Sequence, residues 1–150
     1  MAATILNTTD LQALRQRMQA LTAAAQRRWG SMQATEMLWH LRMQLELALG
    51  LRPLHTQARS ALRLPPLRWL ALYIMPWPKG SPTAPEMNAR KRNAEVQDLA
   101  TEQQLLLQRM SEVLQAQQLG PHPLFGALSY NDWGRLIWKH IDHHMRQFGV

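Results

Sequence analysis

The stretch that decides the fold is SYNDWGRLIWKHIDHHMRQF, residues 129–148. It begins with Ser129, and Asp132 follows three residues later, a pattern typical of a capping box at the start of a helix. Apolar side chains then recur at helical spacing, because Trp133, Ile137 and Phe148 project to one side. We therefore expect a helix from Ser129 onward that buries this side in a core.

Two histidines, His140 and His144, lie on the apolar side of this helix. Their i, i+4 spacing puts them about 40° apart in direction and one turn apart in height. Two imidazoles so placed can bind one metal ion, as in the zinc helices of metalloproteases. The alternatives are an incidental pair, or buried rings that hydrogen-bond a carboxylate. His143 points to the side of Lys139 and Gln147, and we expect it to face outward.

Three further segments have helical periodicity, and no segment shows the two-residue alternation of a strand. They are residues 10–28, 32–49 and 94–119. The sequence thus predicts an all-α chain, folded as a four-helix bundle in one domain of 150 residues.

The connection between the second and third helices, residues 51–93, is long and proline-rich. We expect short helices at 56–64 and 67–75, broken by prolines on both sides. Connections of this length often have a function, and side chains here can face a ligand or simply cover the bundle. The candidates for a ligand contact are Lys79, Thr83 and Glu86.

His40 is the candidate third ligand. It lies on the apolar side of the second helix with Met37, Leu41, Leu45 and Ala48, where it can reach an inward pair on another helix. Three protein ligands leave a coordination position open for water or substrate, as in catalytic metal sites. The competing interpretation of His40 is a core histidine that is satisfied by hydrogen bonds.

The remaining polar candidates are weaker. Asp142 and Glu36 can orient imidazole rings, or can be solvent-facing and capping residues. We expect His55 to be exposed and His122 to order its loop, with a place on a pocket rim as the alternative. The six tryptophans are expected to pack in the core and around its rim.

The composition excludes several classes of function. There is no cysteine, so thiolate metal sites and thiol nucleophiles are ruled out. The net charge of +7 is dispersed along the chain, and no nucleic-acid-binding motif accompanies it. Neither a signal-peptide pattern nor a membrane-spanning run is present, so we expect a cytoplasmic protein with no nucleic-acid and no membrane partner. Association with a membrane surface is the alternative that the length of the apolar runs leaves open.

Several motifs together resemble the DinB and YfiT-like superfamily of bacterial four-helix metalloproteins. They also resemble one branch of it, known only as domain of unknown function 1569. The motifs are WGSM at 29–32, MLWH at 37–40, PKGSPTAPE at 78–86, HPLFG at 122–126 and KHIDHHMRQFG at 139–149. The resemblance covers nearly the whole chain, and it implies that the metal ligands are His40, His140 and His144.

The resemblance also implies a range of functions, because superfamily members include thiol-dependent transferases and metal hydrolases. We expect a divalent ion, zinc first and nickel, iron or manganese as alternatives. The first hypothesis is an enzyme that activates a low-molecular-weight thiol or water for a small-molecule substrate. The second is a protein that binds a metal or small ligand without catalysis, called a carrier below, and the third is a structural or interaction bundle with hydrogen-bonded histidines. Homodimers are common in the superfamily.

Overall fold

A computed structural model of the chain describes residues 1–53 and 59–150. In these residues the protein is all-helical, without a β-strand, as the sequence predicts. A four-helix bundle of the DinB type stays a prediction. The four long helices are α1 (Thr8–Ala20), α2 (Ala34–Ala48), α4 (Leu99–Gln115) and α5 (Tyr130–Gln147). The short helical elements are η1 (Ala61–Arg63), α3 (Pro65–Trp69), η2 (Leu70–Ile74) and η3 (Pro85–Met87).

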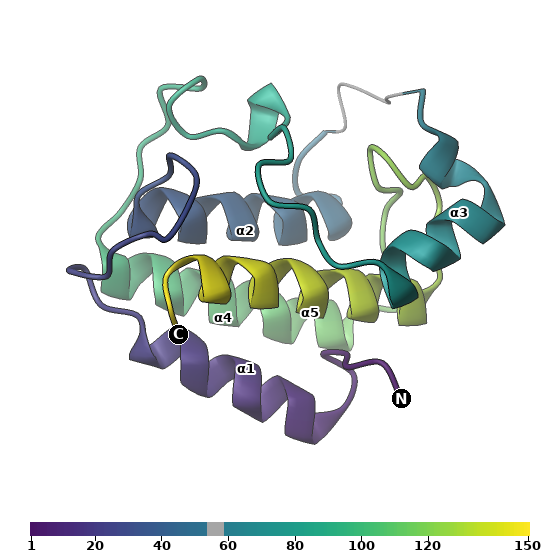
Figure 1. Cartoon of the computed structure of the whole chain (residues 1–150), viewed down its shortest axis with the longest axis horizontal. Coiled ribbons are helices and arrows are strands. Elements are labelled where there is room, and N and C mark those ends of the chain that lie inside the picture. Colours follow the sequence, from purple (N-terminus) through teal and green to yellow (C-terminus); the bar gives the residue numbers. More distant parts are fainter. Residues whose placement is uncertain (54–58) are drawn as a thin grey trace.

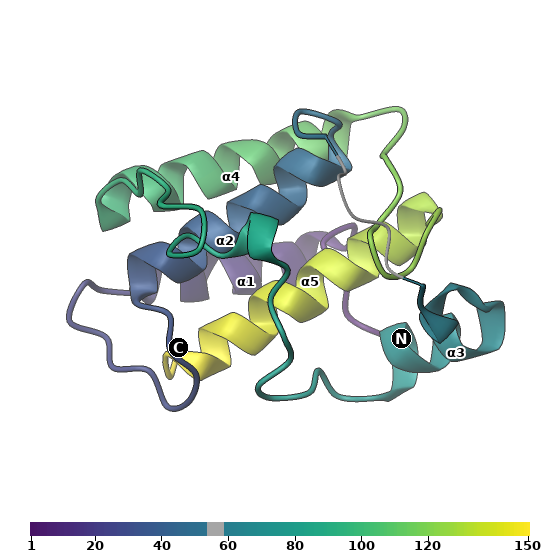
Figure 2. The same ribbon diagram turned by 90° about the horizontal axis from the view of Figure 1, so that it is seen from above.

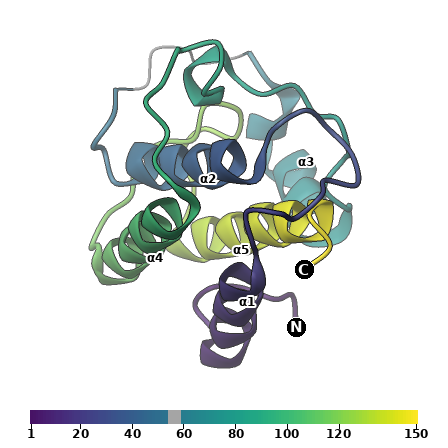
Figure 3. The ribbon, with the colours of Figure 1, turned by 90° about the vertical axis from the view of Figure 1, so that its left-hand side faces the viewer.

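The long helices pack around one core with α2 near its centre. α2 lies against α4 and α5, and α1 lies against α5 and α4 on the opposite side (Figures 1 and 3). In the connection from α2 to α4, η3 lies over α2 on the side away from α1, and η2 packs against α5 (Figure 1). Figure 2 shows that the chain leaving α3 crosses over α5 before it reaches α2.

α2 is buried on all sides, although the sequence predicts only one apolar face for it. Every residue from 37 to 48 is buried, including Arg42 and Glu46. These two side chains pair with each other, and Arg42 also donates two hydrogen bonds to Glu102 of α4, which is fully buried. Buried charges persist when they are paired and hydrogen-bonded in this way.

α1 is shorter than the predicted residues 10–28 and ends at Ala20. The following alanine-rich residues have high helix propensity, so propensity does not explain the end. The side-chain amide of Gln103, from α4, donates hydrogen bonds to the carbonyl oxygens of Met18 and Leu21. A side chain from another helix thus satisfies carbonyls that a longer helix would have bonded itself.

α4 is also shorter than the predicted residues 94–119. At its start, the Asp98 side chain accepts a hydrogen bond from a backbone N–H of the first turn, which makes it the N-cap. At its end, the Tyr130 hydroxyl contacts the carbonyl oxygens of Val113 and Leu114. The Asp98 side chain at the start and the Tyr130 hydroxyl at the end therefore bond the backbone at both ends of a helix that is shorter than predicted.

The predicted helix at 67–75 exists as α3 followed by one π-helical turn, η2. Of the predicted helix at 56–64, residues 56–58 lie outside the described residues, as does His55, and the described part contains the 3-10 turn η1. None of the helices in the described ranges has the length and apolar character needed to cross a membrane.

Candidate metal centre

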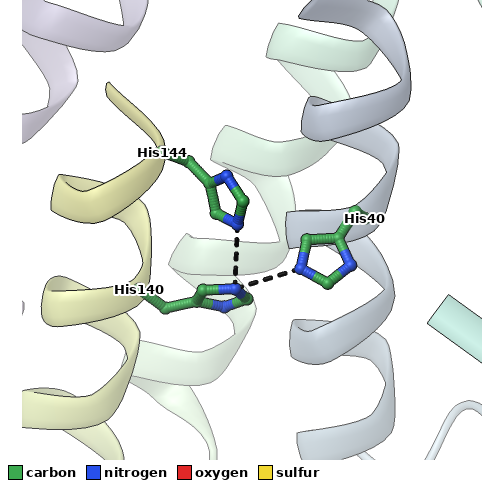
Figure 4. A group of neighbouring side chains, drawn as sticks. All are labelled: His40, His140 and His144. Atoms are coloured by element: carbon green, nitrogen blue, oxygen red, sulfur yellow. Dashed lines mark hydrogen bonds between the residues drawn. The ribbon is translucent and has the colours of Figure 1, made fainter. Parts of the chain in front are cut away.

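Three buried histidines meet where α2 packs against α5 (Figure 4). His40 comes from the middle of α2, and His140 and His144 come from consecutive turns of α5. The Nε2 atom of His140 lies 3.0 Å from Nε2 of His40 and 3.1 Å from Nε2 of His144. One ring nitrogen from each of the three lies within 4.8 Å of the others. The structure thus brings together the three residues selected from the sequence.

The outer nitrogen of each ring has its own partner. Nδ1 of His40 lies 2.9 Å from the carbonyl oxygen of Met87, in η3. Nδ1 of His140 and Nδ1 of His144 each lie 2.7 Å from a side-chain amide oxygen, that of Gln44 and that of Gln147 respectively. A carbonyl oxygen only accepts hydrogen bonds, so each Nδ1 is the protonated nitrogen of its ring.

The Gln147 amide is itself held in one orientation. Its Nε2 donates a hydrogen bond of 2.8 Å to the carbonyl oxygen of Trp29, so its oxygen must face His144. The amide therefore fixes the tautomer of His144 independently of any metal.

These outer hydrogen bonds leave three unprotonated Nε2 atoms, and that of His140 lies within 3.1 Å of the other two. A neutral imidazole carries one proton, and here that proton is on Nδ1. No proton is left to lie between the Nε2 atoms, so their lone pairs face each other. Nitrogen ligands about 2.05 Å from one zinc ion are about 2.9 Å apart at right angles and about 3.3 Å apart in a tetrahedron. Two of the three separations, 3.0 and 3.1 Å from Nε2 of His140, lie between these values, and the three ligand nitrogens all lie within 4.8 Å of one another. The donor set fits a divalent metal ion.

The alternative to a metal is a proton shared between the Nε2 atoms, which would make one ring positively charged. Burial disfavours such a charge. Burial lowers the pKa of His140 well below its ordinary value, and the neighbouring histidines lower it further. Burial also lowers the pKa of His144 to about 3, and it lowers that of His40. All three rings are therefore neutral at pH 7, the state in which imidazole binds a metal.

Aromatic side chains from two connections cover the centre. Trp77 stacks on His140 with ring centroids 4.7 Å apart and planes 16° apart. The ring of His143 contacts Trp77 at 6.1 Å and Trp29 at 5.6 Å, and the Lys79 ammonium lies 4.5 Å from the centre of the Trp29 ring. Lys79 thus belongs to the cover, and the tryptophans here form the rim that the sequence predicts.

The sequence predicted that His143 faces outward, on the side of α5 that carries Lys139 and Gln147. That prediction is wrong, because the aromatic cover lies over this side. His143 is half-buried, and both Lys139 and Gln147 are buried. Lys139 donates hydrogen bonds to the carbonyl oxygens of Ala71 and Met75, so it anchors the turn that precedes Trp77. Helical periodicity identified the core side of α5, but a second layer buries the other side as well.

The two carboxylates considered as ring partners have other roles. Asp142 pairs with Arg17 and Arg146, and no hydrogen bond to a histidine ring is found for it in the described residues. Glu36 accepts from the backbone N–H of Gln33 at the start of α2 and pairs with Arg90. Glu36 is thus a capping residue, as the alternative for it states, whereas Asp142 is a buried ion-pairing residue and not a solvent-facing one.

Sequence reasoning missed the groups that orient the rings. Gln44 lies four residues after His40, and Gln147 lies three residues after His144, so helical spacing was a usable signal for an inward polar neighbour. The backbone carbonyl of Met87 left no such signal, because any residue type supplies one. Only packing brings it to His40.

His122 orders its loop, as expected. Its Nδ1 accepts hydrogen bonds from the backbone N–H groups of Leu124 and Phe125, and its backbone pairs with that of Gly126. Burial lowers the pKa of His122 to about 4, so the ring is neutral at pH 7. Of the other connection candidates, Glu86 lines a small cavity of about 90 Å³ beside α2.

The family of the chain follows from its whole length. A family model described as "Protein of unknown function (DUF1569)" matches residues 2–149. The chain belongs to this family. No curated protein and no solved structure matches it. The DUF1569 assignment predicted from the motifs is confirmed, and the family description names no activity, so function must be argued from the site.

Proposed function

We propose that this DUF1569 protein holds one divalent metal ion through His40, His140 and His144, and that it is a metalloprotein of the DinB-like superfamily. The observation that carries the proposal is the hydrogen bonding of the three outer nitrogens, which turns three lone pairs toward one point. Metal-binding histidines characteristically donate their other N–H to a carbonyl or carboxylate in this way. The ligand set suits zinc, with nickel, iron or manganese as alternatives.

A purely structural role for the histidines accounts less well for the same geometry. Rings that stabilise a core by bonding each other need a proton between each close pair of nitrogens. Here the proton of each ring is already used by Met87, Gln44 or Gln147. Without a cation, the inner contacts bring acceptor against acceptor in a buried site, which costs free energy.

We further propose that the centre is that of an enzyme that activates a thiol or water. A bound divalent ion supplies Lewis acidity, which lowers the pKa of such a nucleophile. The chain has no cysteine, so a thiol must be an external low-molecular-weight one. His143 is placed to take up a proton, because its ring lies 5.1 Å from that of His144 and burial lowers its pKa, which keeps it neutral.

A non-catalytic carrier is the second candidate, and the cover over the site favours it. Each ligand ring is at most 6% exposed, and Trp77 lies flat on His140. A site closed in this way suits retention of an ion, whereas turnover requires the segment around Trp77 to move. Turnover of an added substrate by the metal-loaded protein therefore separates the two candidates.

The experiment that tests the metal is elemental mass spectrometry of untagged protein, as purified and after incubation with zinc, nickel, manganese or iron(II). We expect about one ion per chain, and none in a variant with alanine at His40, His140 and His144. The matched control is His122→Asn, which removes a buried histidine outside the centre and should keep the ion. Circular dichroism checks that each variant is folded.

Two results would overturn the proposal. One is a folded wild-type protein that takes up none of the four metals. The other is metal uptake that survives in the triple variant. If the ion is present, assays of thiol transfer and of ester and amide hydrolysis, with His143→Ala as the test of a proton acceptor, distinguish the enzyme from the carrier.

A further inference from the structure

One edge of the molecule exposes several large apolar side chains. α3 and η2 form a helical projection beside the bundle, at the periphery in Figures 1 and 2. We call its exposed side chains the apolar edge: Leu64, Leu67, Trp69, Leu70, Ile74 and Met75. Trp69 is 55% and Ile74 60% exposed, whereas Leu72 is the one fully buried side chain that the two helical elements contribute to the core. An apolar patch of this kind marks an interaction surface.

The chain segment that carries the apolar edge has charged side chains of one sign only. From residue 47 to residue 85 the sequence contains no aspartate or glutamate. The same stretch contains five basic residues, Arg52, Arg59, Arg63, Arg68 and Lys79, of which Arg52 pairs with Glu46 of α2. Arg63 and Arg68 donate to main-chain carbonyl oxygens of the 120–128 loop, so these contacts leave their charges without a carboxylate.

This charge distribution argues against a second copy of the chain as the partner. In a two-fold symmetric contact the same patch faces itself, so the arginines of one copy would approach those of the other. The stretch itself has no carboxylate to offset that repulsion, and Asp132 of α5, which contacts the projection, already accepts a hydrogen bond from the Tyr73 hydroxyl. Like charges placed together across an interface are costly. The complementary surface is apolar in part and negatively charged.

The projection is also held in place before any partner arrives. Lys139 bonds the carbonyl oxygens of Ala71 and Met75, and the Arg68 guanidinium bonds that of Ala127. A preformed surface loses little conformational entropy when it docks.

We propose that the apolar edge docks on an anionic membrane surface, with its side chains in the headgroup layer and the bundle outside. Interfacial segments that combine leucine and tryptophan with basic residues bind membranes in this manner. Tryptophan prefers the membrane–water interface, and basic residues near it are attracted to anionic lipids. The expectation of no membrane partner rested on the length of apolar runs, which excludes a spanning helix but not surface docking.

The test is flotation of the metal-loaded full chain with vesicles of phosphatidylglycerol, compared with vesicles of phosphatidylcholine. We expect binding to the anionic vesicles, weak binding to the neutral ones, and release when the ionic strength is raised from about 0.05 M to about 0.5 M. The variant Trp69→Ser with Ile74→Ser should bind at least about tenfold more weakly. Leu51→Ser is the matched control, because Leu51 is equally exposed but follows α2, and its binding should not change.

Three results would overturn the proposal. The first is no binding to anionic vesicles, and the second is equal binding by the double variant and the wild type. The third is a concentration-dependent dimer in analytical ultracentrifugation that the double variant abolishes, which would assign the apolar edge to a second copy. Metal content of the double variant is measured in parallel, so failure here is distinct from failure of the metal proposal.

Discussion

Replacing Gln147 with methionine tests whether the outer hydrogen bonds prepare the histidines for a metal. The Gln147 oxygen accepts from Nδ1 of His144 at 2.7 Å, and its nitrogen donates to the carbonyl oxygen of Trp29 at 2.8 Å. Methionine has similar length and volume but accepts hydrogen bonds only weakly. The change therefore removes the acceptor and leaves the core nearly filled.

The expected loss follows from the two tautomers of His144. The metal-bound state requires the proton on Nδ1, whereas the metal-free variant can move it to Nε2, where His140 lies 3.1 Å away. The variant thus loses the hydrogen bond mainly in the metal-bound state. Removing such a partner typically lowers metal affinity 10- to 100-fold, which is about 1.4 to 2.8 kcal/mol.

The assay is a competition titration with a chromophoric chelator, with zinc and then cobalt(II), at pH 7.5. The matched control is Gln103→Met, because Gln103 also bonds buried main-chain carbonyls through its amide but lies between α4 and α1. We expect the control to lose stability and to keep its metal affinity. Equal affinities of wild type and Gln147→Met, within about twofold, would refute the reasoning about the tautomer.

Three further changes test the fold around the centre. Burial lowers the pKa of His122 from 6.5 to about 4, so the folded state binds fewer protons than the unfolded state between these values. The free energy of unfolding that the neutral His122 ring contributes is fully present above pH 6.5, and it is lost as the pH falls toward 4. Urea unfolding should therefore show that wild type loses about 2 kcal/mol more than His122→Asn between pH 8 and pH 5. Glu102→Ala leaves Arg42 of α2 buried without this partner and should cost about 3 to 5 kcal/mol in the same assay, whereas a cost below about 1 kcal/mol would contradict the inferred role. Gly134→Ala should lower the thermal midpoint despite the better helix propensity of alanine, because the new Cβ would lie 2.6 Å from Cγ of Leu6, and a raised midpoint would show that the N-terminal segment yields easily.

The sequence was informative wherever a property depends on neighbours along one helix. The period of Trp133, Ile137 and Phe148 correctly placed His140 and His144 in the core, and Ser129 caps α5 as predicted. A helix determines directions and heights of its own side chains, so a local pattern is enough for them. The absence of cysteine likewise excludes thiolate ligands, however the chain folds.

Tertiary structure decided what depends on contacts between distant segments. Gln103 of α4 donates a hydrogen bond to a backbone carbonyl at the end of α1, and Tyr130 donates one to a carbonyl at the end of α4. Neither helix end therefore follows from local propensity. The proton on His40 is held by a main-chain carbonyl 47 residues away, and His143 is half-buried because the α2–α4 connection folds over α5. The sequence determined which imidazoles point inward, because one helix sets that alone. Packing decided which ring nitrogen of each histidine carries the proton, because the hydrogen-bond acceptors belong to other turns, helices and loops.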